Sequence, residues 1–242
     1  MNQEPAEFAE LLGPDNEEFG VVTARRVGPN GAIAISRGKY PKGYPSTEPN
    51  EDGVMASVVG DSTIVAVVDG HNGFAAAGAV LHAVRTALPD LHDASLDRGA
   101  RLTATLTNAA AAIHGDSGCA ALLARIGPHR VEVCSRGDAR ALLVRGRRVR
   151  RLSRTSSFLG PTDDLSAAGT TGVRVKSGDV LILGSDGLFD FLSGNGMAQV
   201  RTAIDPADPM ATARGLIGCA FAGGAGDNIA VAAFNHGTAS LD

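Results

Sequence analysis

The stretch Ile64–His71, which reads IVAVVDGH, carries a β-branched apolar run directly into an aspartate. Runs of this kind form buried strands, and the buried end of a strand tolerates an unpaired carboxylate poorly. Three more aspartates border short apolar segments elsewhere in the chain: Asp138 in SRGDAR, Asp186 in LILGSDG and Asp227 in GDNIAV. This repetition predicts that several strand ends converge on a cationic group.

A cluster of divalent metal ions is the cationic group that we expect. Carboxylate oxygens are hard ligands, and because no Cys-x-x-Cys or His-rich motif lies nearby, they favour Mg²⁺ or Mn²⁺ over zinc or copper. Such ions point to phosphate chemistry. Each aspartate taken alone is more typical of a turn, since Asp-Gly and Gly-Asp pairs are ordinary turn signals. Their shared position beside apolar runs favours the metal interpretation.

The composition indicates a single globular domain over residues 1–242. Hydrophobic residues make up 44% of the 242 residues, charged residues 20%, and the net charge is −4, so neither disorder nor electrostatic binding to nucleic acid is expected. The sequence has no run of about 20 apolar residues that could span a membrane, and its acidic N-terminus lacks the features of a secretory signal. We therefore expect a cytoplasmic protein, a monomer, with no nucleic-acid or membrane partner.

The three cysteines, Cys119, Cys134 and Cys219, are widely spaced in apolar surroundings. We expect reduced thiols that pack in the core, and neither disulfides nor a zinc site.

Hydrophobic periodicity predicts strands in blocks and helices in blocks, which favours an α+β layered fold over repeating βαβ units. Two central helices are expected at Phe74–Leu88, ending before Pro89, and at Ala94–Ile113, with shorter ones at 187–192, 197–203 and 210–221. The polar stretch Arg154–Thr171 is expected to be a loop. The expected strands are Gly20–Val27, Ala32–Ser36, Val54–Val59, Ile64–Val68, Ala120–Ile126, Val131–Cys134, Ala139–Val144, Gly172–Val175, Val180–Leu183 and Asn228–Phe234.

A run of arginines between Arg145 and Arg154 stands out in an otherwise mildly charged chain. Its alternating spacing on a hairpin is most simply a solvated edge strand, where charge discourages association between sheet edges. A docking surface for an acidic or phosphorylated partner is the alternative. Nucleic-acid binding is disfavoured because no aromatic residues are interleaved.

Six motifs, taken in order, resemble the signatures of the metal-dependent type 2C Ser/Thr protein phosphatases, in particular the compact bacterial branch. They are NED at 50–52, VVDGHNG at 67–73, SGCA at 117–120, GDAR at 137–140, GSDGLFD at 184–190 and DNI at 227–229. The resemblance extends from about Gly20 to Phe234. It implies a four-layer sandwich in which two central antiparallel β-sheets are flanked by α-helices. Residues 1–18 then form an N-terminal extension, and 154–171 a shortened flap loop.

The resemblance also implies how the acidic residues hold two metal ions. Asp69 would bridge the ions, and the carbonyl of Gly70 would complete one coordination shell. Asp186 and Asp227 would bind the other ion. The remaining candidates have lesser roles: Glu51 and Asp52 would hold metal-bound waters, Asp138 together with Asp186 would bind a third, weaker ion, and Asp163 or Asp164 could contribute to that third site.

His71 follows the bridging aspartate directly, and the resemblance implies that it is the general acid for the leaving alkoxide. The alternative is a histidine that only orients a carboxylate through a hydrogen bond. Thr47 occupies the position of the usual phosphate-binding arginine. The upstream cations Arg37, Lys39 and Lys42 lie in a segment that is lengthened, relative to the family pattern, by Pro41–Pro45. Among them we expect Arg37 to replace that arginine, because a guanidinium can bind phosphate through two hydrogen bonds.

Three smaller departures from the family pattern leave the expected ligands in place. Asn72 replaces a glycine and Ala139 a serine, while Thr155-Ser156 replaces an Asp-His pair. The last change, in the shortened flap, is expected to alter substrate selection.

The expected activity is hydrolysis of phosphoserine and phosphothreonine monoesters in proteins by a metal-activated water, with Mn²⁺ or Mg²⁺ as cofactor. The expected partners are phosphoproteins, either Ser/Thr kinases or their targets. Two alternatives remain open from the sequence: a phosphatase-like sensor without catalysis, and a small-molecule phosphatase. A calcium-binding structural domain is disfavoured, because the aspartates lack the close spacing of a calcium loop.

Overall fold

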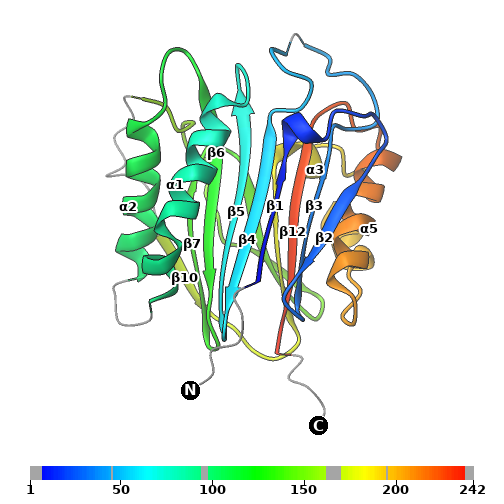
Figure 1. Cartoon of the computed structure of the whole chain (residues 1–242). Helices are drawn as coiled ribbons and strands as arrows, with labels where there is room; N and C mark the ends of the chain where they lie inside the picture. Colours follow the sequence, from blue (N-terminus) through cyan, green and yellow to red (C-terminus); the bar gives the residue numbers. More distant parts are fainter. Residues whose placement is uncertain (1–6, 45, 94–97, 162–169, 195, 238–242) are drawn as a thin grey trace.

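The computed structural model of the chain describes residues 7–44, 46–93, 98–161, 170–194 and 196–237. Two antiparallel sheets of six strands each lie face to face (Figure 1). In spatial order the first sheet consists of β1 (Glu7–Leu12), β4 (Asp52–Val59), β5 (Ser62–His71), β6 (Gly118–Ile126), β7 (Arg130–Arg136) and β10 (Thr170–Arg174). The second consists of β2 (Thr23–Val27), β3 (Gly31–Ser36), β12 (Ile229–His236), β11 (Asp179–Gly184), β8 (Arg140–Arg145) and β9 (Arg148–Arg151).

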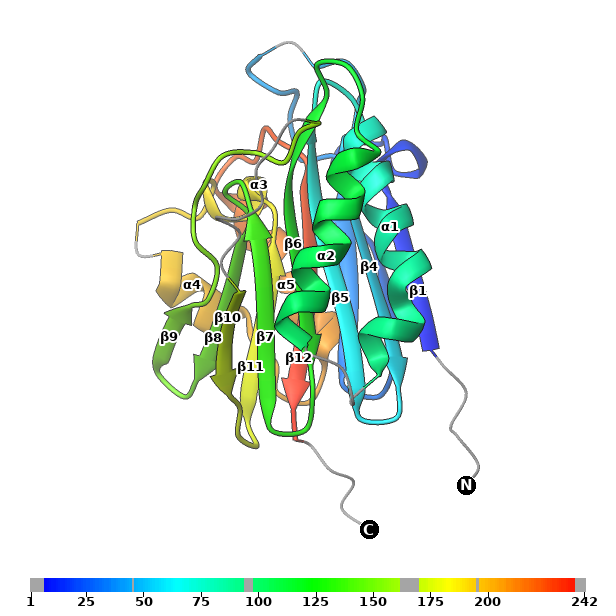
Figure 2. The same cartoon turned by 90° about the vertical axis from the view of Figure 1, so that its left-hand side faces the viewer.

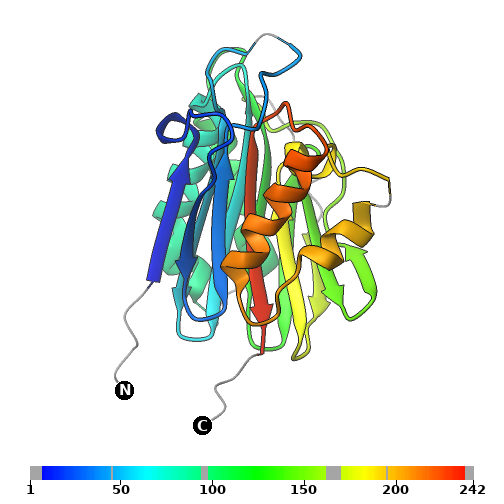
Figure 3. The ribbon, with the colours of Figure 1, turned by 90° about the vertical axis from the view of Figure 1, so that its right-hand side faces the viewer.

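Helices cover the outer face of each sheet. The first sheet is covered by α1 (Ala75–His92) and α2 (Arg98–Ala111), which lie side by side over β4, β5 and β7 (Figure 2). The second sheet is covered by α4 (Gly196–Ala203) and α5 (Pro209–Ala222), and Figure 3 shows α5, in orange, lying across the red strand β12. The short α3 (Asp186–Phe189) follows β11 directly.

The molecule has four layers, namely the two sheets and the helices on each outer face, and three layers of apolar side chains pack between them. Val67, Leu122 and Leu183 belong to the layer between the two sheets, while Leu81 and Leu106 belong to the layer between the first sheet and its helices. A third layer packs the second sheet against α4 and α5. Alternate residues of a strand face opposite sides, so strands buried on both faces must be apolar almost throughout, as IVAVV is. The predicted α+β four-layer sandwich is confirmed.

Several element boundaries differ from prediction by a few residues, and two of the differences bear on the packing. Glu7–Leu12, within the predicted N-terminal extension, pairs with β4 and buries Ala9 and Leu11. The predicted end of the first helix before Pro89 is wrong, because α1 continues to His92. A proline in the last turn removes a single hydrogen bond, and burial of Leu91 offsets that loss.

The predicted edge strand in the arginine run is confirmed, since β9 lies at one edge of the second sheet and pairs with β8. Arg145, the first residue of the arginine run, donates two hydrogen bonds of 2.7 and 2.6 Å to the buried carboxylate of Asp179. The three cysteines are free thiols. Cys119 and Cys134 are buried, as predicted, whereas Cys219 is only half-buried. None of the described helices is long and apolar enough to cross a lipid bilayer.

Candidate metal centre

The predicted aspartates lie where strands of both sheets end. Asp69, near the end of β5, is the register partner of Asp52, which opens β4. Asp186 comes just after β11 and Asp227 just before β12, and these two strands are antiparallel neighbours. Asp138 lies in the turn from β7 in the first sheet to β8 in the second. The fold therefore brings carboxylates from both sheets to one end of the sandwich.

Three of these carboxylates form a compact cluster. One oxygen from each of Asp69, Asp138 and Asp186 lies within 4.8 Å of the others. Asp69 is 5% exposed, and both its Oδ2 and the Oδ1 of Asp138 are buried without a hydrogen-bond partner in the described structure. Buried carboxylate oxygens are normally paired. Unpaired oxygens that face other carboxylates fit divalent cations with hard oxygen ligands.

The protonation equilibria of the cluster indicate the same need for positive charge. Burial raises the pKa of Asp52 to about 8, with the negative charges of Asp186 and Asp227 acting in the same direction. Burial, followed by the charge of Asp52, also raises the pKa of Asp69 well above its usual range. Burial raises the pKa of Asp186 as well. So many carboxylates can be ionised together only when cations neutralise them.

Gly70 allows close packing around the cluster. A Cβ atom at this position would lie 2.7 Å from the carbonyl oxygen of Glu51 and 2.8 Å from that of Gly73. The Gly70 amide also donates to the Glu51 carbonyl at 3.1 Å. Only glycine fits here, so the backbone that follows Asp69 can lie directly against the backbone of Glu51.

Glu51 is buried and bound on both carboxylate oxygens. Its Oε1 accepts a 2.8 Å hydrogen bond from the amide of Gly73, just before α1, and its Oε2 accepts one of 3.1 Å from Lys42. Asn228, which is also buried, accepts a 3.0 Å hydrogen bond from the Glu51 amide and donates to the carbonyl oxygens of Arg37 and Pro49. Asn228 thus ties the start of β12 to the loop that carries Glu51.

Within the part of the chain that the structure describes, Lys42 is the cation in contact with the candidate ligands Glu51 and Asp227. Its side chain is 7% exposed, and Nζ lies 3.1 Å from a carboxylate oxygen of Glu51 and 3.2 Å from one of Asp227. Burial would lower the pKa of Lys42, but Asp227 and the hydrogen bond to Glu51 raise it above its usual range. Tyr44 donates to the other oxygen of Asp227 at 2.9 Å. The loop inserted before Glu51 therefore reaches into the acidic site.

Arg37, the expected phosphate-binding residue, is engaged elsewhere. Its guanidinium lies 3.8 Å from the centre of the Phe19 ring and donates to the carbonyl oxygen of Glu17 at 2.8 Å. No described contact joins its side chain to a predicted metal ligand. The sequence could not reveal this, because Phe19 and Glu17 meet the Arg37 side chain only in the folded chain.

His71 lies at the end of β5, beside the cluster. Its Nε2 is buried and makes no hydrogen bond within the described chain, and the ring of Phe158 lies over it with the two centroids 4.0 Å apart. Asn72, which follows, has φ +61° and donates to the carbonyl oxygen of Asp116. Asparagine tolerates this left-handed conformation better than most residues, which explains why it can replace the glycine of the family pattern.

The sequence analysis did not foresee the contacts of Tyr44, Asn228 and Phe158. The inserted Pro41–Pro45 loop was the only signal for Tyr44, and a large apolar residue within a polar loop the only one for Phe158. The suggested ligands Asp163 and Asp164 lie outside the described residues.

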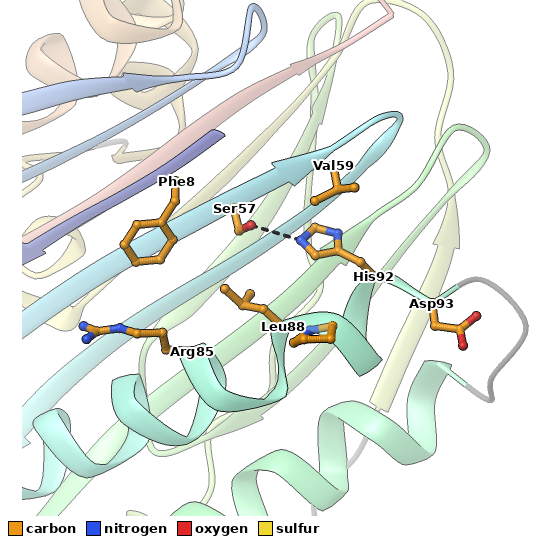
Figure 4. A pocket seen from close by; sticks show the side chains of 8 residues that line it. Phe8, Ser57, Val59, Arg85, Leu88, His92 and Asp93 are labelled. Atoms are coloured by element: carbon orange, nitrogen blue, oxygen red, sulfur yellow. Dashed lines mark hydrogen bonds between the residues drawn. The ribbon is translucent and has the colours of Figure 1, made fainter. Parts of the chain in front are cut away.

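A cavity of about 710 Å³ lies between β4 and the C-terminal half of α1, away from the acidic site (Figure 4). Phe8, Leu88 and His92 line it, and so do Ser57 and Val59 near the end of β4 opposite Asp52. The His92 ring contacts the hydroxyls of Ser57 and Ser62, each at 3.1 Å. None of the predicted site residues borders this cavity.

Comparisons with known proteins agree with the fold. The chain superposes on the manganese-bound catalytic domain of the serine/threonine protein phosphatase PstP with a TM-score of 0.70 and 20% identity, over 90% of this chain and 100% of that one. The serine/threonine phosphatase PstP/Ppp of Mycobacterium tuberculosis superposes with a TM-score of 0.69 and 21% identity, over 90% of this chain and 100% of that one. A third structure contains the PP2C phosphatase domain of SpoIIE from Bacillus subtilis with a fragment of its regulatory domain. It superposes with a TM-score of 0.65 and 15% identity, over 91% of this chain and 70% of that one.

Among curated proteins, no sequence matches the chain. The model of the family described as stage II sporulation protein E (SpoIIE) matches residues 52–231, which include all four aspartates that border apolar runs and exclude Lys42 and Glu51. That match covers most of the chain and confirms the resemblance drawn from the motifs. The chain belongs to the SpoIIE family and has the fold of the PP2C phosphatases.

Proposed function

We propose that this protein is a Mn²⁺- or Mg²⁺-dependent phosphatase that hydrolyses phosphoserine and phosphothreonine monoesters in proteins. The observation that carries the proposal is the convergence of Asp69, Asp138 and Asp186, with buried oxygens of two of them unpaired. A phosphate monoester is a dianion, so its hydrolysis at neutral pH needs cations near the phosphoryl oxygens. A partly buried carboxylate cluster at the end of the sandwich is suited to hold such cations.

The ligands proposed for two ions are Asp69, the Gly70 carbonyl, Asp186 and Asp227, with Glu51 and Asp52 acting through water. Asp138 is proposed for a third, weaker ion. When bound, the ions would neutralise phosphoryl oxygens and acidify the attacking water. Because the donor set consists of oxygen atoms, Mg²⁺ and Mn²⁺ are favoured over softer metals. Both oxygens of Asp227 are paired, one with Lys42 and the other with Tyr44. Asp227 must therefore give up one of these contacts when it binds a metal ion.

His71 is proposed as the proton donor to the leaving serine or threonine oxygen. Its position directly after Asp69 and Gly70 and its unpaired Nε2 support this role. An alkoxide is a poor leaving group, so proton transfer matters for phosphothreonine and much less for aryl esters.

Lys42 is proposed to supply the positive charge that the family takes from an arginine at the Thr47 position. It is the cation in contact with Glu51 and Asp227, whereas the Arg37 guanidinium is committed to Phe19 and Glu17. An ammonium group can bind a phosphoryl oxygen as a point charge, although it lacks the paired hydrogen bonds of a guanidinium.

Phosphorylated proteins, including Ser/Thr kinases and their targets, are the proposed substrates. The likeness to PstP, a serine/threonine phosphatase, supports this class. A second structure with a similar fold is PppA, described as a regulatory component of a secretion system in Pseudomonas aeruginosa, with a TM-score of 0.62 and 19% identity. We further propose a single catalytic domain, a monomer acting in the cytoplasm, with 154–171 as a short flap that influences substrate choice.

The test is phosphate release from a phosphothreonine peptide in Mn²⁺ and in EDTA, by the wild type, Asp186→Ala and Asp61→Ala. Asp61 is an exposed aspartate in the turn at the opposite end of β5, so it is a matched control. We expect turnover that requires Mn²⁺, is lost in Asp186→Ala and is retained in Asp61→Ala. Binding of Mn²⁺ without any turnover by the wild type would overturn the proposal in favour of a non-catalytic sensor.

A further inference from the structure

Phe158 is a large aromatic residue in a polar segment, and its backbone is fixed on both sides. On one side the amide of Gly137 donates to the Ser157 carbonyl at 2.9 Å, and the amide of Ser156 donates to the Gly137 carbonyl at 3.0 Å. On the other side Leu159 and Cys119 exchange two backbone hydrogen bonds of 2.8 and 3.0 Å. The ring position is therefore set by the strands β6 and β7, although the side chain is 45% exposed.

Gly137 makes room for this ring. A Cβ atom at Gly137 would lie 3.0 Å from Cδ1 of Phe158 and 2.6 Å from the Cβ of Ala120. Gly137 also has φ +76°, a conformation that other residues adopt only with strain. The turn before Asp138 thus accommodates Phe158 as well as carrying a candidate metal ligand.

The phenyl ring lies against the imidazole of His71, with the centroids 4.0 Å apart and the planes tilted by 60°. Tilted aromatic rings in contact attract each other beyond the apolar area that they bury. No hydrogen bond to Nε2 restrains the imidazole within the described structure. The tilted contact with Phe158 is then a restraint on how the His71 ring is oriented.

We propose that Phe158 is a positioning residue, which holds the His71 imidazole in the orientation required for proton transfer and keeps water from one of its faces. This inference rests on the proposed phosphatase function. A ring that can rotate away from the leaving oxygen loses part of its catalytic effect, because general acid catalysis needs the donor within hydrogen-bond reach.

The test compares the wild type with Phe158→Ala, Phe158→Tyr and Phe8→Ala. Tyrosine keeps the ring and can place its hydroxyl in solvent, while Phe8 is a matched control on β1 that is 47% exposed. In Phe158→Ala we expect kcat for a phosphothreonine peptide to fall about 10- to 100-fold, with about a twofold change or less for p-nitrophenyl phosphate. Phe158→Tyr should restore most of the lost rate, and Phe8→Ala should resemble the wild type on both substrates.

Two further measurements separate positioning from a structural role. In a His71→Ala background, Phe158→Ala should cause no additional loss on the peptide, since the residue that it positions is absent. In NMR spectra of the metal-free protein, the His71 ring protons should shift on Phe158→Ala and return close to their original positions in Phe158→Tyr. The spectra require no turnover, so they test the contact independently of the phosphatase function.

Several results would overturn the inference. Equal losses on both substrates in Phe158→Ala would indicate a structural defect, and an unchanged His71 spectrum would show that the contact does not form in solution. A wild type without turnover would overturn the proposed function and the positioning role with it, even if the spectra confirmed the contact.

Discussion

Replacing Lys42 by methionine should destabilise the metal-free protein and have much less effect on the metal-bound one. The lysine side chain is 7% exposed and pairs with Glu51 at 3.1 Å and Asp227 at 3.2 Å. Methionine is apolar, so it removes the only cation that these carboxylates contact in the described structure. Removing one partner of a buried ion pair costs about 3–5 kcal/mol. Asp227 keeps its hydrogen bond from Tyr44, so we expect the lower end, about 3 kcal/mol.

For a chain of this size, about 3 kcal/mol corresponds to a Tm about 6–12 °C lower in EDTA. Thermal unfolding in EDTA and in saturating Mn²⁺ measures the effect. In Mn²⁺ the deficit should largely disappear, because divalent ions would replace the lost positive charge. Lys39→Met is the control, since Lys39 lies on the same segment and, among the described residues, its ammonium group contacts a backbone carbonyl, at 3.5 Å, and an aromatic ring but no carboxylate. An unchanged Tm in EDTA, or the same loss of Tm with and without Mn²⁺, would show that Lys42 does not neutralise these carboxylates in the metal-free protein.

Other perturbations have equally definite outcomes. His71→Ala should slow phosphothreonine turnover by roughly 10²–10⁴-fold and spare p-nitrophenyl phosphate; equal losses in steady-state kinetics would argue against a proton donor. Arg145→Ala should lower the free energy of unfolding at neutral pH in urea titrations, because the buried Asp179 carboxylate loses its cation and keeps the hydrogen bond from the Lys176 amide; no loss would argue against the pair. Burial would raise the pKa of Asp179, but Arg145 lowers it, so this stabilisation should disappear as the pH falls below the usual aspartate range. Burial lowers the pKa of His92 to about 4, so the free energy of unfolding should fall by about 1–2 kcal/mol, allowing for solvent screening, as the pH falls from about 6.5 to 4. His92→Gln should abolish that loss. A variant whose free energy of unfolding depends on pH as the wild type's does would contradict this prediction.

The sandwich could be predicted as far as local patterns determine it. Apolar runs such as Ile64–Val68 and Val180–Leu183 became strands because a strand buried on both faces needs little besides apolar side chains. The pairing of the strands into two sheets came from the family resemblance, since periodicity carries no information on partners. β1 was missed because Glu7 and Glu10 make it look like a polar terminus, although Ala9 and Leu11 alternate towards the core.

The site could be predicted where a residue's place follows from its own strand. Asp69 and Asp186 border apolar runs, so their convergence could be expected before the fold was known. The partners of Lys42 depend on how the inserted loop folds back over Glu51, which no local pattern encodes. Arg37 was predicted as the phosphate ligand from its chemistry, and its contact with the ring of Phe19 could not be read from the sequence.

A crystal structure of the protein grown with Mn²⁺, with the ions located by anomalous scattering, tests most directly whether the acidic residues at the end of the sandwich form a two-metal centre. We predict two manganese ions about 4 Å apart, bridged by Asp69, with Asp186 and Asp227 on one of them and Lys42 withdrawn from Asp227. Manganese bound elsewhere, or an acidic site that stays free of metal with Lys42 still between Glu51 and Asp227, would contradict it.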